Sequence, residues 1–208
     1  MSTNKPIDFV IIWVDGNDPL WRKEKSEYDG TVITTANSEV RFRDWDNLQY
    51  WFRAVEKYAP WVNKIHFVTW GHLPSWLDTT NPKLNIVNHK DYIPEEYLPT
   101  FSSHTIELNL HRIEGLAEQF VYFNDDMFPV GECKPEDFFR NGRPVIGYYR
   151  HLFASGMYKK ICRNSDRLAR KALGMKPSCF FTRPQHIWSP MLKSQCEELY
   201  DKVEDEIR

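Results

Sequence analysis

The segment "EQFVYFNDDMFPV", residues 118–130, ends an apolar, strand-like run on Asn124, Asp125 and Asp126. Adjacent carboxylates at a strand end are the hard oxygen ligands that a divalent cation uses when it bridges phosphate oxygens. A turn is the alternative, because Asn and Asp are favoured turn residues that bond their own backbone. The motif alone leaves the two interpretations even. Since a turn needs only one such residue, three in a row favour a site.

A second polar group follows the first apolar run of the chain. The segment "VDGNDP", residues 14–19, contains Asp15 and Asp18. Asp-Gly and Asp-Pro pairs are common turn signals, so this segment taken alone is interpreted as structural. Its interest comes from where it is expected to lie, beside the carboxylates at 125 and 126.

Two arginines precede the first expected helix. In "VRFRDW", Arg41 and Arg43 lie on one side of a strand-like segment, where planar guanidinium groups could hold a diphosphate. Exposed arginines paired with Asp44 or Asp46 are at least as well supported by the spacing.

A helical pattern is expected over residues 102–115. Its apolar positions are Ile106, Leu110 and Ile113, and Gly115 would cap its end. The opposite face carries His104, Glu107 and His111. Such a face could supply or orient a general base, although a merely solvated face is the commoner outcome.

The elements that must position these residues alternate between strand and helix. Continuous apolar runs at 9–14, 64–70, 84–89 and 120–123 predict strands buried on both faces, and residues 43–60 predict a helix closed by Pro60. This alternation predicts an α/β fold with a doubly wound, mostly parallel sheet. Ligands collect beyond the carboxyl ends of such strands, so Asp15, Asp18, Asp125 and Asp126 are expected to share one rim.

The 208 residues fit one domain with a net charge of -2, and most of the eight tryptophans are expected in its core. Charge is uneven, because residues 140–183 carry eleven Lys or Arg and one acid. We therefore expect an α/β core over 1–139 and an appended, basic and largely helical lobe over 140–208, ending in an acidic helix.

Several classes are excluded or disfavoured. The chain has no G-x-G-x-x-G, Walker or G-x-S-x-G motif. Its four cysteines form no C-x-x-C pair, which predicts reduced thiols in a cytoplasmic protein. The N-terminal apolar run is too short for a signal segment or a membrane span.

Two long stretches resemble the first two conserved regions of the Stealth family of sugar-1-phosphate transferases, which is related to the animal lysosomal-enzyme N-acetylglucosamine phosphotransferase. These stretches are "IDFVIIWVDGNDPLW" (7–21) and residues 41–128, which include "EKYAPWV", "LPTFSS", "HRIEGL" and "FNDDMF". The segment "RPQHIWSPMLKSQCEELY" (183–200) is similar to the third region, with His186 as the match. Nothing in the chain corresponds to the fourth region.

The resemblance implies transfer of a hexose 1-phosphate from a nucleotide sugar, expected to be a UDP-sugar, to a hydroxyl of an acceptor glycan in capsule or exopolysaccharide synthesis. It implies a fold like the nucleotide-sugar-binding domain of glycosyltransferases. Asp125 and Asp126 would bind Mg²⁺ or Mn²⁺, and Asp8, His111 or His186 would accept the acceptor proton. The expected substrate-binding residues are Trp13, Asp15, Asp18, Arg41, Arg43, Glu107 and Arg112.

Three alternatives stay open. An ordinary metal-dependent glycosyltransferase would transfer the sugar without its phosphate. A catalytically silent nucleotide-sugar- or glycan-binding module would fit the missing fourth region and the abundant tryptophan. A nucleic-acid surface over 140–183 is the weakest, because no reading motif is present and phosphate-rich donors or peripheral contact with an anionic membrane explain the charge equally well.

Overall fold

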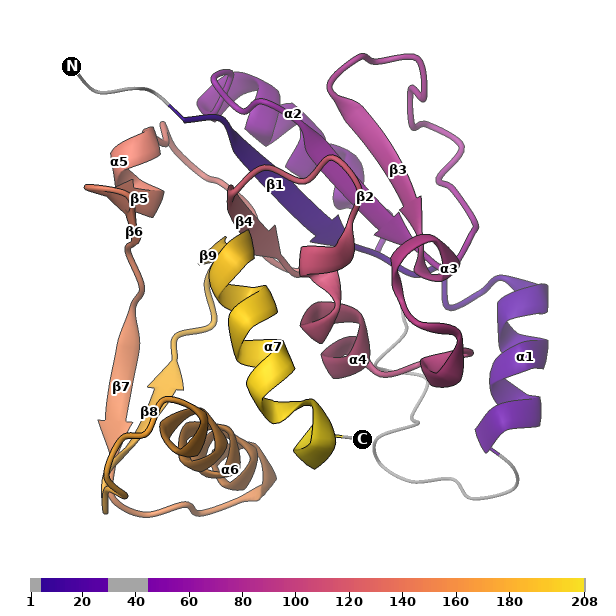
Figure 1. The fold of residues 1–208 in the computed structure, drawn as a ribbon. Helices are drawn as coiled ribbons and strands as arrows, with labels where there is room; N and C mark the ends of the chain where they lie inside the picture. The colour runs from indigo at the N-terminus through magenta and orange to yellow at the C-terminus, as the bar shows by residue number, and fades with distance from the viewer. Residues whose placement is uncertain (1–4, 30–44, 208) are drawn as a thin grey trace.

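The computed structural model describes residues 5–29 and 45–207. Strands and helices are interspersed along the first half of the chain, and the strand that ends at Thr69 leads into the one that begins at Leu84 without a helix between them, as Figure 1 shows. In chain order they are β1 Ile7–Ile12, α1 Pro19–Asp29, α2 Leu48–Tyr58, β2 Ile65–Thr69, β3 Leu84–Asn88, α3 His89–Tyr92, η3 Glu95–Tyr97, α4 Ser103–Leu108, η4 Leu110–Arg112, β4 Gln119–Phe123, α5 Pro135–Phe138, β5 Phe139–Arg140, β6 Arg143–Pro144, β7 Tyr148–His151, α6 Met157–Ala172, β8 Phe181–Pro184, β9 Ser189–Leu192 and α7 Lys193–Ile207.

The main sheet has five strands in the order β3-β2-β1-β4-β9. The strands β1 to β4 are mutually parallel, and β9 runs antiparallel to β4. Phe9 lies opposite Ile65 on one side and Val121 on the other. All four predicted parallel strands are present, within about two residues of their expected bounds, so the α/β prediction is confirmed at this level.

One face of the sheet is covered by α2 and α5. Phe9 is fully buried there, and its ring packs against Phe123 at 4.8 Å and Trp61 at 5.7 Å between centroids. The helix α2 contributes Trp51 and Val55 to this core, because residues three and four apart lie on one helix face. Aromatic pairs of this kind add about 0.5–1.5 kcal/mol each beyond the area that they bury.

The other face is covered by α3, α4 and α7, and Figure 1 shows α7 on the opposite side of the sheet from α2. Val10, Phe120 and Tyr122 point to this side, one residue out of phase with Phe9 and Val121, as expected from the two-residue repeat of a strand. Both faces of the central strands are therefore shielded from solvent, which explains their continuous apolar sequence.

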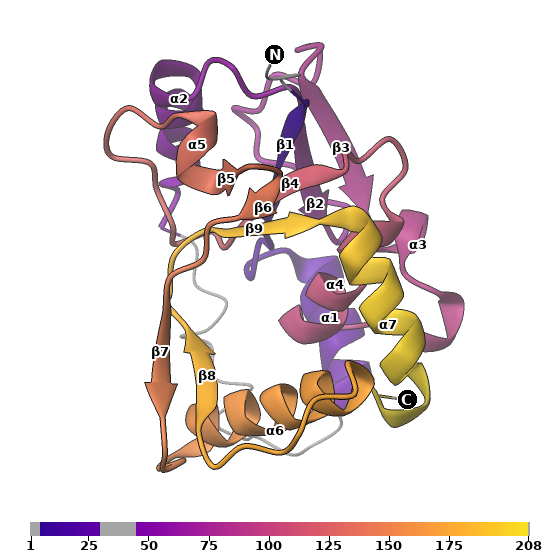
Figure 2. The ribbon, with the colours of Figure 1, turned by 60° about the vertical axis from the view of Figure 1, so that its left-hand side comes forward.

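The last third of the chain departs from the predicted appended lobe. The strands β7 and β8 pair with each other, and α6 contacts β8 and α7, forming the group of elements seen away from the sheet in Figure 2. However, β9 then returns to the main sheet beside β4. Within residues 140–208, β7, β8 and α6 thus form a group apart from the main sheet, whereas β9 belongs to that sheet. The region includes strands as well as helices.

All four cysteines lie in the described part of the chain, and each is a free thiol. No helix within residues 5–29 or 45–207 combines the length and the apolar character needed to cross a bilayer.

Candidate active site

The expected rim lies where the sheet changes direction. From the central β1 the chain builds outward through β2 and β3, and then returns to add β4 on the other side of β1. Loops after β1 and β4 leave the sheet in opposite directions at such a point, which opens a crevice at their carboxyl ends. Ile11 pairs with Phe123, so the segments carrying Asp15 and Asp125 follow neighbouring strand positions.

The turn after β4 uses Asn124 and exposes the two carboxylates. The backbone N–H of Met127 donates to the carbonyl of Asn124 at 3.1 Å, and the Tyr122 hydroxyl donates to Oδ1 of Asn124. Asp125 and Asp126 are both exposed. The segment is therefore a turn, and it also presents two adjacent carboxylates at the rim.

His186 joins this turn from a distant part of the chain. Ser189, the first residue of β9, lies opposite Tyr122 near the end of β4. Because the two strands are antiparallel, the residues just before Ser189 lie beyond the carboxyl end of β4. There His186 Nε2 lies 3.0 Å from Oδ2 of Asp126, and about two thirds of each side chain is solvent-accessible. The structure thus brings together two residues that the sequence separates by sixty positions.

Glu107 is linked to the same turn through a hydrogen bond with Tyr122. Burial raises the pKa of its carboxyl group, and a hydrogen bond with Tyr122 offsets this only in part. Tyr122 also bonds Asn124, so a polar chain connects Glu107 to the turn that carries the carboxylates. Electrostatic interaction between Glu107 and Tyr158 places the start of α6 near the same point.

The rim after β1 is organised by a histidine that the sequence did not single out. The backbone N–H of Asp15 donates to Nε2 of His72 at 2.7 Å, so the proton of the neutral ring is on Nδ1, which faces Oδ2 of Asp18 at 3.5 Å. Burial lowers the pKa of His72, which favours this neutral form. Asp18 also accepts hydrogen bonds from the N–H groups of Leu20 and Trp21 and so caps α1. A lone histidine in a loop carries no sequence pattern, which is why it was missed.

Asp8 does not belong to this rim, so the geometry gives no support to its predicted catalytic role. It lies at the opposite, amino end of β1 with no solvent exposure. Its carboxylate accepts hydrogen bonds from His66, Asn63, Lys64 and Ala117. Burial would raise its pKa, but the bonds from His66, Asn63 and Ala117 outweigh this, and the pKa is lowered. Asp8 is a structural carboxylate.

His111 and Arg112 also lie away from the carboxylates. The predicted helix stops at Leu108, where the Asn109 side chain donates to the carbonyl of Thr105 at 2.9 Å, so the expected face no longer continues to His111. His111 is buried, with its ring 5.3 Å from that of Tyr200 in α7. Arg112 lies over the same tyrosine ring at 4.8 Å. Both residues hold α7 in place, and the prediction of His111 as a base is not supported.

The other predicted substrate-binding residues divide into two groups. Trp13 is buried at the end of β1, packed against Phe67 and His72. Arg41 and Arg43 lie outside the described residues.

The donor set around the carboxylates decides which kind of metal site they suit. Among residues 5–29 and 45–207, no group of three or more His, Cys, Asp or Glu side chains is arranged to hold a metal ion. Mg²⁺ in phosphoryl-transfer sites is commonly bound by one or two carboxylates, with substrate phosphates and water completing the shell. Asp125 and Asp126 fit that open type of site.

Comparison with known proteins places the chain among its relatives. The model of Stealth protein CR1, conserved region 1, matches residues 5–32, and that of CR2, conserved region 2, matches residues 41–145. The chain is 61% identical over 150 residues to the capsular polysaccharide phosphotransferase WcwK of Streptococcus pneumoniae, covering 70% of this chain and 45% of WcwK. It is 54% identical over 136 residues to the receptor polysaccharide phosphotransferase WefC of Streptococcus gordonii, covering 64% and 41%.

A third relative is matched over most of both chains. The capsular polysaccharide phosphotransferase eps5J of Streptococcus thermophilus is 43% identical over 185 residues, covering 84% of this chain and 78% of eps5J. The chain spans less than half the length of WcwK and WefC. Matches of this extent, over both conserved regions and most of one relative, show that the chain belongs to the Stealth family.

Proposed function

We propose that this chain transfers a hexose 1-phosphate from a nucleotide sugar, expected to be a UDP-sugar, to a hydroxyl of an acceptor glycan in capsule or exopolysaccharide synthesis. The observation that carries the proposal is the pairing of His186 with Asp126, next to Asp125, at the switch point of the sheet. Curated relatives named as polysaccharide phosphotransferases support this reaction class. The strand order β3-β2-β1-β4 supports a nucleotide-sugar-binding domain of the glycosyltransferase type.

In this proposal the acceptor oxygen attacks the phosphorus that carries the sugar. The bond from that phosphorus to the bridging oxygen breaks, and the nucleoside monophosphate leaves with the bridging oxygen. Because Nε2 of His186 faces Asp126, Nδ1 is the nitrogen available to take the proton of the acceptor hydroxyl. The Asp126 carboxylate then stabilises the positive ring and holds its orientation.

Asp125 and the second oxygen of Asp126 would hold a Mg²⁺ or Mn²⁺ ion. When bound, that ion neutralises charge on the diphosphate. Further positive charge is available from the stretch 140–183, whose helix α6 begins near Glu107. Asp15 and His72 shape the neighbouring wall of the crevice. We place the reaction in the cytoplasm, where nucleotide sugars are made, with peripheral contact to an anionic membrane as the alternative use of the basic stretch.

The test is the identity of the released nucleotide. The full chain is incubated with a UDP-sugar, Mg²⁺ or Mn²⁺ and an acceptor glycan, and products are separated by ion-exchange chromatography. UMP supports the proposal, whereas UDP alone identifies an ordinary glycosyltransferase. Binding of the UDP-sugar without turnover, across a range of acceptors, identifies a silent binding module.

Two substitutions test the assigned residues. Asp126→Asn keeps the shape but removes one charged ligand and the charged partner of His186, so we expect UMP release to fall by about 10²–10⁴-fold. His186→Gln should lower the rate without changing the affinity for the metal. Asp205→Asn, an exposed change on α7, is the matched control. Undiminished metal-dependent turnover in Asp126→Asn would refute the assignment.

A further inference from the structure

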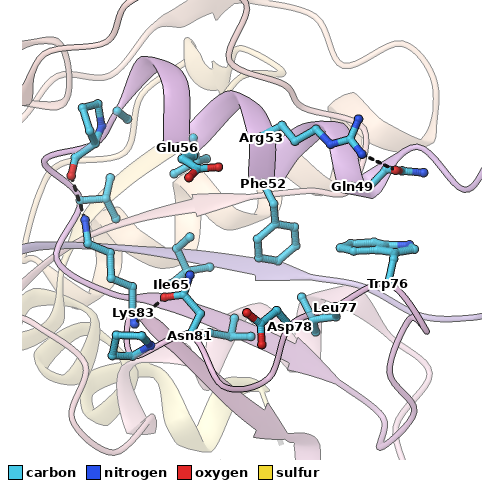
Figure 3. Close-up of a pocket in the computed structure, with 16 residues that line it drawn as sticks. Gln49, Phe52, Arg53, Glu56, Ile65, Trp76, Leu77, Asp78, Asn81 and Lys83 are labelled. Atoms are coloured by element: carbon cyan, nitrogen blue, oxygen red, sulfur yellow. Dashed lines mark hydrogen bonds between the residues drawn. The ribbon is translucent and has the colours of Figure 1, made fainter.

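A second concave site lies between α2 and the segment that joins β2 to β3, outside the crevice described above. The cavity has a volume of about 540 Å³. Figure 3 shows α2 on one side of it and residues 76–83 on the other. Pockets for small organic ligands commonly have volumes of about 300–1,000 Å³. The space is therefore of a size that admits a few linked sugar rings.

Two aromatic rings project into this space. Phe52 comes from α2 and Trp76 from the facing segment, and their centroids lie 5.6 Å apart with the planes inclined at 66°. Both side chains are half-buried and rest on the core cluster of that face. Core side chains thus support each ring on the side away from the cavity. The C–H faces of a hexose stack on indole and phenyl rings supported in this way, and the same rings offer no charge to a phosphate.

The edges of the cavity carry planar polar groups. Arg53 donates to Gln49 at 3.2 Å and lies over the Tyr50 ring at 5.4 Å, and its guanidinium group carries further N–H donors; Figure 3 shows Arg53 and Gln49 at one edge of the cavity. Glu56, one turn further along α2, is exposed and makes no hydrogen bond or ion pair within the described residues. On the facing side, the amide group of Asn81 accepts from the N–H of Lys83 and still has donors to offer. Such groups pair with adjacent hydroxyls.

The charges of the lining cancel. Its two basic side chains, Arg53 and Lys83, are matched by two carboxylates, Glu56 and Asp78. Asp78 is moreover engaged by the N–H and hydroxyl of Thr80 at 2.9 and 2.6 Å. A nucleotide or another phosphate-rich ligand would select a basic lining. This one suits an uncharged, hydroxyl-rich ligand.

The cavity and the crevice are linked through buried aromatic rings of the core. A row of ring contacts runs from Trp13 at the end of β1 through Phe67 and Phe52 to Trp76, with centroid distances of 5.7, 6.0 and 5.6 Å. Trp76 also follows His72 by only four residues. Trp76 in the cavity is thus supported by the same buried aromatic rings that pack behind the rim after β1.

We propose that this cavity binds an uncharged stretch of the acceptor glycan, at a distance from the hydroxyl that reacts. The proposal rests on the proposed transfer to a glycan, but its binding step can be measured without turnover.

The binding test uses the full chain labelled with 5-fluorotryptophan, whose eight tryptophan signals are followed by fluorine NMR. Trp76→Phe identifies the Trp76 signal. Neutral linear gluco-, galacto- and manno-oligosaccharides of one to six units are titrated to about 10 mM, which nearly saturates a site with a Kd of about 1 mM. We expect a saturable shift of the Trp76 signal that strengthens with chain length and persists in Asp126→Asn.

Glu56→Ala provides the polar test, because within residues 5–29 and 45–207 this exposed side chain makes no hydrogen bond or ion pair whose loss would disturb folding. It should raise the Kd of the oligosaccharide about tenfold, whereas Glu114→Ala, an exposed change outside the cavity, should not. In turnover assays Glu56→Ala should raise KM for long acceptors and leave a single-sugar acceptor unaffected.

The outcomes are distinct. A Trp76 signal that responds to no oligosaccharide, that responds to the UDP-sugar instead, or that is buried by self-association seen in light scattering overturns the proposal. Oligosaccharide binding at Trp76 with no turnover under any condition upholds the glycan site and refutes the proposed transferase function.

Discussion

Asp8 provides the sharpest test of how the fold uses its carboxylates. Its two oxygens accept four hydrogen bonds, from Asn63 Nδ2 at 2.7 Å, Lys64 N at 3.1 Å, His66 Nε2 at 3.0 Å and Ala117 N at 2.8 Å. These partners tie the start of β1 to the start of β2 and to the residues before β4. We predict that Asp8→Asn lowers stability strongly and leaves the chemistry of folded protein intact.

The magnitude follows from the donors that lose their acceptor. An asparagine retains one oxygen, for the Asn63 and Lys64 donors, and turns an NH₂ group toward the donors of His66 and Ala117. Each buried donor left without a partner costs about 1–3 kcal/mol, and two donors, those of His66 and Ala117, lose their acceptor. We therefore expect a loss of about 2–6 kcal/mol, a large part of the 5–15 kcal/mol that is usual for a domain of this kind.

The assay is urea unfolding followed by circular dichroism, with UMP release measured on the folded protein. The pKa of Asp8 is lowered, so its stabilisation is present above the unfolded value of 3.8 and is lost as pH falls below it. The difference between wild type and Asp8→Asn should thus hold from neutral pH to about 4 and shrink below. Asp205→Asn should change stability by less than about 0.5 kcal/mol. Wild-type stability together with abolished UMP release would refute the reasoning and restore Asp8 as a catalytic group.

Two further predictions concern other buried or bridging carboxylates. Burial raises the pKa of Glu107, and a carboxyl group with a raised pKa costs stability above its unfolded value of 4.5. In urea unfolding at pH 7, Glu107→Gln should therefore be more stable than wild type by an amount on the order of 1 kcal/mol. Below pH 4.5 the two proteins should have the same stability. Equal stability at pH 7 would contradict this reasoning. Asp166 accepts bonds from Arg170 and from Thr182 in β8, so Asp166→Asn should speed amide hydrogen exchange in α6 and β8 while β1 stays protected. Faster exchange throughout the sheet would show instead that the outer elements and the core unfold together.

The parallel strands were predictable because burial on both faces leaves a continuous apolar run that solvent-exposed segments do not show. The fifth strand was not. The segment "SPML" is short and contains Pro190, and it is tolerated only at the sheet edge, where the missing N–H faces away from β4. The helix expected over 102–115 is shorter for a local reason, because Asn109 bonds Thr105 and α4 ends at Leu108, before the face that was to include His111 is complete. His72 and the glycan-sized cavity depend on tertiary placement, and no local pattern indicates either.

The paired carboxylates after β4 show why a turn and a site need not be alternatives. A turn requires one residue that can bond its neighbours, and Asn124 fills that role through Tyr122 and Met127. The next two positions, Asp125 and Asp126, are exposed, and the turn does not require an acidic residue at either one. Two adjacent negative charges repel, so they are expected to lower stability at that point unless a cation is bound. His186 faces Asp126 there, and it is brought by a strand whose pairing depends on β4 itself. The strand that creates the turn therefore also positions the base proposed to work beside it.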